Sequence, residues 1–248
     1  MQHWHLQEEE AMKKLIGIVP KGILYDPEGN TSTDIYTFGN NYAKRILEAG
    51  ALPVTLAPVD GRLPQEALEK MDGFLAVGGS TFWPYHFQAI HHAVENGKSF
   101  LGTCLGMQLI HCYFCTRDLV EARGYQGDLG DAIIETFFGE DLETTMIEKV
   151  QGHMSEKCLR GEEDKVKHDV SVVPGTRLEA LLGRQTARGA SYHNWRVHDV
   201  SPKLTVNAYA TDGTETIEGI EYNDRIIGVQ FHPEVDALLP EIYKFLAE

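Results

Sequence analysis

The sequence has few basic residues, no long apolar run and few cysteines. Its 248 residues include 22 Lys and Arg against 37 Asp and Glu, which gives a formal net charge of -15. Binding to nucleic acid or to an anionic membrane depends on a surplus of Lys and Arg, so this composition predicts neither partner. No apolar stretch approaches the ~20 residues of a membrane-spanning helix, and four cysteines are too few for a disulfide-dense secreted scaffold. We therefore expect a cytoplasmic protein with reduced thiols.

The first residues also lack a secretory signal. The segment MQHWHLQEEE has neither a basic start nor an apolar core. Met12 stands just before a strand-like run, so we expect residues 1–11 to be an extension outside the fold. The remaining residues, 12–248, have the length and composition of a single globular domain.

Short apolar runs alternate with amphipathic ones in the first half of the chain. Apolar runs predict strands at residues 15–19, 52–56, 73–77 and 99–102. The segments between them, which include NNYAKRILEAG, PQEALEKM and FQAIHHAVENG, have helical spacing. This alternation predicts an α/β fold, a single domain with a mostly parallel central sheet flanked by helices, and places ligands at the carboxyl ends of the strands.

The second half of the chain is organised differently. Residues 117–166 are acidic and lack a clear period, although DLGDAIIETFFG has the composition of a helix, so we interpret this region as an insertion. A lid, a homodimer interface and a docking surface for another protein are all compatible with it. Beyond the insertion, HDVSVV, LTVNAYA, TIEGIEY and RIIGVQF predict strands, and RLEALLG and LPEIYKFLA predict helices.

Cys104 lies between two glycines where a predicted strand gives way to a predicted helix. The segment GTCLG has the form of a nucleophile elbow, a strained turn in which flanking glycines avoid Cβ clashes. The dipole of the following helix favours the thiolate, and the N–H of Leu105 points to where a substrate oxyanion would form. The alternative is a core cysteine in a glycine-rich loop.

A nucleophilic cysteine needs a base and a group that orients the base. His232 and Glu234 are two residues apart in GVQFHPE, so at the end of an extended strand they project to the same side. Pro233 between them favours an extended backbone at His232. The alternative is an ordinary His-Pro turn. Together with the elbow, the segment predicts a catalytic triad of Cys104, His232 and Glu234.

Two further segments are candidates for substrate contact. In AVGGS, the backbone of Gly79 can approach a tetrahedral intermediate, and its neighbour Gly78 can approach the substrate. The loop ASYHNW presents Ser191, Tyr192 and His193, which suit a pocket wall, although a plain loop is nearly as compatible. We expect no metal and no organic cofactor, since the triad itself supplies nucleophile, base and oxyanion stabilisation.

The segments LGTCLGMQ, AVGGS and GVQFHPE together resemble the class I glutamine amidotransferase superfamily, whose triad is Cys-His-Glu in that order. The resemblance implies a flavodoxin-like fold, an oxyanion hole at Gly79 and Leu105, and a contact of Gln108 with the glutamyl end of the substrate. It extends from Lys14 to Glu248 apart from the acidic insertion. The implied chemistry is attack of Cys104 on a γ-glutamyl amide and hydrolysis of the resulting thioester.

Within that superfamily, EAGALPVTLAP and ATDGTETIEGIEY are similar to the peptidase C26 group, which includes gamma-glutamyl-gamma-aminobutyrate hydrolase. That group usually has G-G-x-D-V-x-P where this chain has GGSTFWP, Arg at the position of Leu105, and a G-G-T-L-x-Q-D stretch that is missing here. The resemblance favours a free-standing hydrolase of small γ-glutamyl amines. The alternatives are a glutaminase subunit that supplies ammonia to a separate synthase, and a non-catalytic binding protein on the same fold.

Overall fold

The computed structural model describes residues 12–24, 34–154, 167–235 and 239–248. The expected extension at residues 1–11 and the last part of the predicted insertion, 155–166, lie outside the described residues.

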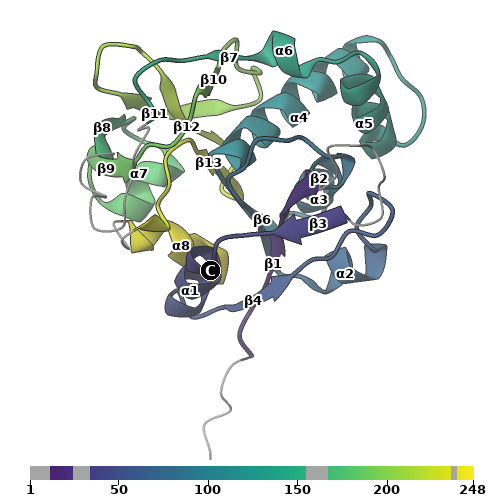
Figure 1. Ribbon diagram of the computed structural model, residues 1–248, viewed down its shortest axis with the longest axis horizontal. Helices are drawn as coiled ribbons and strands as arrows, with labels where there is room; N and C mark the ends of the chain where they lie inside the picture. Colours follow the sequence, from purple (N-terminus) through teal and green to yellow (C-terminus); the bar gives the residue numbers. More distant parts are fainter. Residues whose placement is uncertain (1–11, 25–33, 155–166, 236–238) are drawn as a thin grey trace, which may run out of the picture.

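A nine-stranded sheet forms the centre of the molecule, in the order β4-β1-β5-β6-β13-β12-β11-β8-β9 (Figure 1). From β4 to β13 every neighbouring pair is parallel, and from β13 to β9 every pair is antiparallel. The parallel strands are β4 (Leu52–Thr55), β1 (Leu15–Val19), β5 (Gly73–Ala76), β6 (Ser99–Thr103) and β13 (Ile226–Val229). The antiparallel strands are β12 (Ile217–Tyr222), β11 (Thr205–Ala210), β8 (Lys167–Val172) and β9 (Thr186–Ala190). The structure confirms the expected α/β fold.

Two short antiparallel pairs stand apart from the central sheet. One pairs β2 (Lys21–Leu24) with β3 (Asp34–Thr37), and the other pairs β7 (Ile147–Lys149) with β10 (Trp195–Val197). The second pair joins the predicted insertion to the loop that contains Tyr192 and His193, so segments far apart in the sequence meet there.

Helices cover both faces of the sheet (Figure 1). The helices on one face are α3 (Pro84–Glu95), α4 (Leu105–Ala122) and α5 (Leu129–Gly139), and those on the other are α1 (Asn40–Glu48), α7 (Arg177–Leu182) and α8 (Pro240–Ala247). Successive side chains of a strand point to opposite faces, so in β5 Phe74 packs toward the first group of helices and Leu75 toward the second. Both faces of the parallel strands are thereby buried under helices, which explains their continuous apolar runs.

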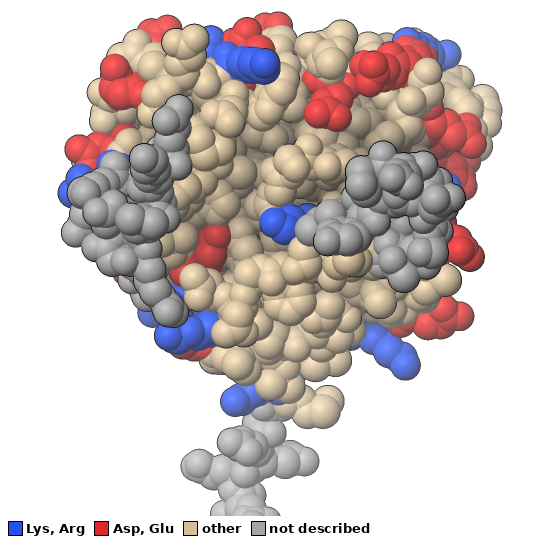
Figure 2. Space-filling view, viewed as in Figure 1, with Lys and Arg blue, Asp and Glu red and all other residues tan. Residues whose placement is uncertain are grey.

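The region predicted as an insertion is largely built onto the core. Helix α4 continues to Ala122, and α5 packs against both α3 and α4. Helix α6 (Glu143–Met146) and β7 follow at the same end of the molecule. Figure 2 shows Asp and Glu side chains along the margin of this face over α5 and α6. The short helix α2 (Gln65–Lys70) completes the fold, and none of the helices in the described ranges is both long and apolar enough to cross a membrane.

Candidate active site

Cys104 is held in a strained turn between β6 and α4. Its φ is 53° and its ψ is -106°, a backbone conformation that residues other than glycine rarely adopt. The two glycines of the motif allow this turn to pack closely. A Cβ on Gly102 would lie 2.4 Å from the carbonyl oxygen of Gly106, and a Cβ on Gly106 would lie 2.5 Å from the carbonyl oxygen of Ala76 in β5. The structure therefore has the geometry of a nucleophile elbow.

His232 and Glu234 are brought together by a turn. Strand β13 ends at Val229, and the N–H of Val235 donates to the carbonyl oxygen of His232 at 3.3 Å. The extended backbone expected through Glu234 is absent there, because the chain must bend away from the sheet edge toward α8. The side chains still meet, since Nδ1 of His232 lies 2.6 Å from Oε1 of Glu234. A hydrogen bond from the backbone N–H of His232 to Ala190 fixes the start of the turn.

The charges around His232 favour its imidazolium form. Burial alone would lower the pKa of His232, but the negative charge of Glu234, and then that of Cys104, outweigh burial and raise it well above the ordinary value. Nε2 of His232 is buried, and within the described residues it has no partner with hydrogen-bond geometry. Cys104 is itself 6% exposed. The arrangement therefore leaves Nε2 available for proton exchange beside the buried Sγ of Cys104.

Tyr42 of α1 binds the backbone of the first glycine of AVGGS and lies near Glu234. Its hydroxyl accepts a hydrogen bond from the backbone N–H of Gly78 at 3.0 Å. Burial, and then the nearby carboxylate of Glu234, raise the pKa of Tyr42 well above its ordinary value. A Cβ on Gly78 would lie 2.7 Å from Cε1 of His232, so only glycine lets the imidazole pack there. No sequence motif pointed to Tyr42, whose position in a helical pattern carried no chemical signal.

A cavity of about 130 Å³ opens beside Cys104. Leu105 is the first residue of α4, so its backbone N–H has no acceptor within the helix. Leu105 and Gly79 both line the cavity. Gln108 also lines it and donates from Nε2 to Oε1 of Gln230 at 3.2 Å and to the carbonyl oxygen of Trp195 at 3.3 Å. The other lining residues are Ser80, Phe82, Glu143, Ile147, Met154, Tyr192, His193, Asn194 and Trp195.

The loop that contains Ser191, Tyr192 and His193 forms one wall of this cavity. The ring of Tyr192 meets the ring of His232 edge to face, with 5.4 Å between their centres. His193 reaches the cavity, but its imidazole belongs to a separate buried cluster of polar side chains described below. Ser191 and Gly78 are absent from the cavity lining, and Oγ of Ser191 instead donates to the carbonyl oxygen of His153 at 2.7 Å.

The position of Glu143 in this cavity was not anticipated from the sequence. Burial, and then the negative charge of Asp141, raise the pKa of the Glu143 carboxyl group. Glu143 belongs to a run of acidic residues that looks like a solvated surface in the sequence, and only the packing of α6 against α4 turns it toward the site.

The family model for glutamine amidotransferase class-I matches residues 32–239. This range contains the elbow, AVGGS and the segment with His232 and Glu234. The chain therefore belongs to the class I glutamine amidotransferase family, and the resemblance inferred from its motifs is confirmed at that level.

The chain is similar to several proteins along much of its length. Protein NtpR of Enterococcus hirae is 23% identical over 245 residues, with 90% of this chain and 92% of that protein covered. The imidazole glycerol phosphate synthase subunit HisH of Microcystis aeruginosa is 28% identical over 212 residues, with 80% and 85% covered. A CTP synthase of Halobacterium salinarum is 29% identical over 199 residues, which are 76% of this chain but 34% of the synthase. The chain thus spans about a third of that enzyme's length.

Solved structures show the same fold. The glutaminase domain of CTPS from Trypanosoma brucei, with bound acivicin, superimposes with a TM-score of 0.63 at 19% identity and covers 95% of this chain and 93% of that chain. A glutamine amidotransferase from Thermotoga maritima gives a TM-score of 0.55 at 16% identity, with 91% and 77% covered. These likenesses confirm the architecture.

Proposed function

We propose that the protein hydrolyses the γ-glutamyl amide bond through a Cys104–His232–Glu234 triad. The observation that carries this proposal is the convergence of a strained Cys104, a hydrogen-bonded His232–Glu234 pair and a small cavity at one sheet edge. Family membership agrees with amide hydrolysis of the glutaminase type.

In the proposed mechanism His232 holds the proton of Cys104, so that the thiolate Sγ attacks the γ-carbonyl carbon while the N–H groups of Gly79 and Leu105 stabilise the oxyanion. His232 gives its proton to the amide nitrogen, so the C–N bond breaks and the amine leaves. Water then attacks the thioester while His232 accepts a proton, and glutamate leaves as the C–S bond breaks. The sum is one γ-glutamyl amide plus one water to glutamate plus one amine.

We infer that the preferred substrates are small γ-glutamyl amines. The cavity is smaller than the ~300–1,000 Å³ of pockets for drug-sized ligands, which indicates a substrate of about amino-acid size. Its wall combines polar side chains with the apolar Phe82, Met154 and Trp195, and these three suit the carbon chain of an amine better than free ammonia. The similarity to the peptidase C26 group supports an amine such as γ-aminobutyrate, without a metal or organic cofactor in the reaction.

A second candidate is a glutaminase subunit that passes ammonia to a synthase partner. The observation that favours it is similarity along most of the chain to a protein named as a subunit of imidazole glycerol phosphate synthase. In that case the acidic margin over α5 and α6 becomes a candidate docking surface (Figure 2). A non-catalytic binding protein is disfavoured, since the three triad side chains are all present and close together.

The decisive experiment measures glutamate release by the purified protein alone. The substrates are glutamine and a panel of γ-glutamyl amines that includes γ-glutamyl-γ-aminobutyrate, and Cys104→Ala is the control. Turnover of an amine that depends on Cys104, with glutamine poor, supports the hydrolase. Turnover of glutamine alone supports the glutaminase subunit, and turnover that persists in Cys104→Ala contradicts the mechanism.

A further inference from the structure

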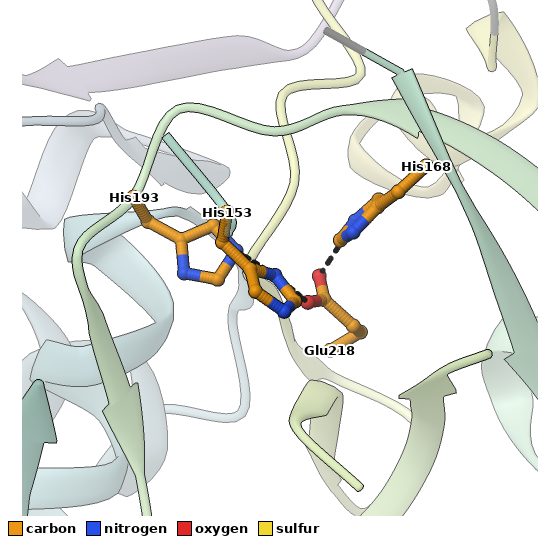
Figure 3. A group of neighbouring side chains, drawn as sticks. All are labelled: His153, His168, His193 and Glu218. Carbon is orange, nitrogen blue, oxygen red and sulfur yellow. Dashed lines mark hydrogen bonds and ion pairs between the residues drawn. The ribbon is translucent and has the colours of Figure 1, made fainter. Parts of the chain in front are cut away.

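Four ionisable side chains outside the triad converge in the antiparallel half of the molecule (Figure 3). They are His153, which precedes the undescribed residues 155–166, His168 in β8, His193 in the wall of the active-site cavity, and Glu218 in β12. His153, His193 and Glu218 are buried and His168 is half-buried. One nitrogen or oxygen atom from each lies within 4.8 Å of the others.

Hydrogen bonds on the outer side of this cluster indicate which ring nitrogens carry lone pairs. Nδ1 of His193 lies 3.0 Å from the carbonyl oxygen of Trp195, which can only accept, so Nδ1 carries the hydrogen and Nε2 is the lone-pair atom. Nε2 of His153 lies 3.0 Å from Oδ2 of Asp212, so Nδ1 of a neutral His153 is likewise the lone-pair atom. These two nitrogen atoms lie at a hydrogen-bond distance of 3.2 Å, so either a proton or a metal ion must offset their two lone pairs.

The carboxylate of Glu218 points at the same place. Its Oε1 lies 3.3 Å from Nδ1 of His153 and 3.4 Å from Nε2 of His193, and its Oε2 lies 3.3 Å from Nε2 of His168. Glu218 is 0% exposed. Within the described residues, neither of its oxygens has a partner that meets hydrogen-bond geometry. Electron-pair donors that converge in a buried site need a positive charge between them, because a buried unpaired carboxylate is very costly.

The spacing of the atoms from His153, His193 and Glu218 fits three corners of a tetrahedral metal site, and His168 lies within reach of the fourth corner. Zinc binds imidazole nitrogen at ~2.0–2.1 Å and carboxylate oxygen at ~2.0–2.2 Å, so neighbouring ligand atoms of a tetrahedron lie about 3.3–3.4 Å apart. The separations of 3.2 to 3.4 Å around His153, His193 and Oε1 of Glu218 match this edge length. In metalloproteins a zinc-bound histidine usually donates its other ring N–H to a carboxylate or a backbone carbonyl. Asp212 and the carbonyl oxygen of Trp195 contact the outer ring nitrogens of His153 and His193 in this way.

We propose that His153, His168, His193 and Glu218 form a binding site for one divalent transition-metal ion of the zinc type. Four protein ligands fill a tetrahedral site, which is the pattern of a structural metal. The ion ties β8 and β12 to the loop from Ser191 to Trp195 and to the segment at His153. It thereby fixes the wall that holds Tyr192 against His232, and this role is separate from the triad chemistry.

Protons provide the other source of positive charge, in a metal-free network of imidazolium groups around Glu218. The test uses the full chain with its affinity tag removed, since a histidine tag would itself bind metal. The protein is freed of metal with a chelator and titrated with Co²⁺, and visible absorption and bound metal are measured. We expect one equivalent of Co²⁺ with the intense bands of four-coordinate cobalt, displaced by Zn²⁺. Binding below ~0.1 equivalent overturns the proposal and supports the proton network.

Single substitutions test which residues bind the metal. Glu218→Gln and His168→Ala should abolish the four-coordinate spectrum, while His198→Ala, a histidine outside the cluster, should leave it unchanged. Asp212→Asn covers the case in which a ligand variant fails to fold, because Asp212 is partly exposed and meets the cluster only at the outer nitrogen of His153. Its other oxygen, Oδ1, accepts hydrogen bonds from the backbone N–H and the hydroxyl of Thr214, and the side-chain oxygen of asparagine can accept these as well. We expect it to fold and to weaken Zn²⁺ binding ~10–100-fold. An unchanged affinity in Asp212→Asn together with an unchanged spectrum in His168→Ala would place the metal elsewhere.

Discussion

In the parallel half of the sheet, from β4 to β13, the polar side chains of the site follow the ends of strands, whereas in the antiparallel half two of the clustered residues lie within strands. Cys104 comes directly after β6, and His232 follows β13. His168 and Glu218 lie inside β8 and β12, which are separated by β11 in the sheet. Parallel strands present their carboxyl ends at one edge, so motifs there meet by topology alone.

The antiparallel half has no such common edge. Its cluster depends on the pairing register of three strands and on two loops, so the four residues meet only after the sheet has formed. We infer a division of roles, in which the parallel half holds the catalytic side chains and the antiparallel half positions the wall of the pocket.

The largest effect is expected for Cys104→Ala. Loss of the nucleophile should reduce turnover of the best γ-glutamyl substrate by at least ~10³-fold, because no other group can form the thioester. Cys115→Ala is the matched control, since this free thiol lies farther along α4 and outside the lining of the active-site cavity. Initial rates of glutamate release measure both. Comparable losses in the two variants would assign the effect to folding rather than to chemistry.

Glu234→Gln should lower kcat ~10–100-fold and change its pH dependence. The charge of Glu234 helps to raise the pKa of His232, so its removal should lower that pKa. His232 must hold a proton to release the amine, and activity is therefore lost as pH rises through the His232 pKa. The alkaline limb of the kcat profile should move to lower pH in the variant. If the alkaline limb stays at the same pH, a group other than His232 is responsible for it.

Gly106→Ala should destabilise the parallel half by ~1–3 kcal/mol, because the new Cβ would meet the carbonyl oxygen of Ala76 at 2.5 Å. Gly139→Ala is the control, since no atom lies within 4 Å of its Cβ position and its φ is negative. The free energy of unfolding from urea titration compares them. Equal stabilities would show that α4 can move away from β5 at no cost.

These contrasts also explain how much could be predicted from the sequence. The α/β order of the first half followed from apolar runs and helical spacing, because buried parallel strands have a continuous apolar sequence. The elbow and the His232–Glu234 pair were recognisable since each is a local motif at a strand end. The hairpin of β2 and β3 and the pair of β7 and β10 were missed, because such short strands have no distinct periodicity.

The residues missed by the sequence analysis share a different cause. Tyr42 and Glu143 reach the site through helix packing, so their roles depend on tertiary contacts that no spacing encodes. His193 was expected at the substrate, and the structure places its ring in the cluster with His153 and Glu218. The four cluster residues are spread along the chain, whereas sequence patterns for zinc rely on ligands a few residues apart.

The smallest effect, and the sharpest test of the division, is expected for His168→Ala. This residue contacts Glu218 and does not line the cavity, so its loss should loosen the wall at Tyr192 while leaving the elbow intact. We expect KM for the best substrate to rise several-fold and kcat to change less. The rate at which iodoacetamide alkylates Cys104 should stay within about twofold of the parent, because thiol reactivity depends on the elbow and His232. An alkylation rate that fell in step with the rise in KM would mean that the antiparallel half controls the nucleophile as well, and the two halves would then act as one site.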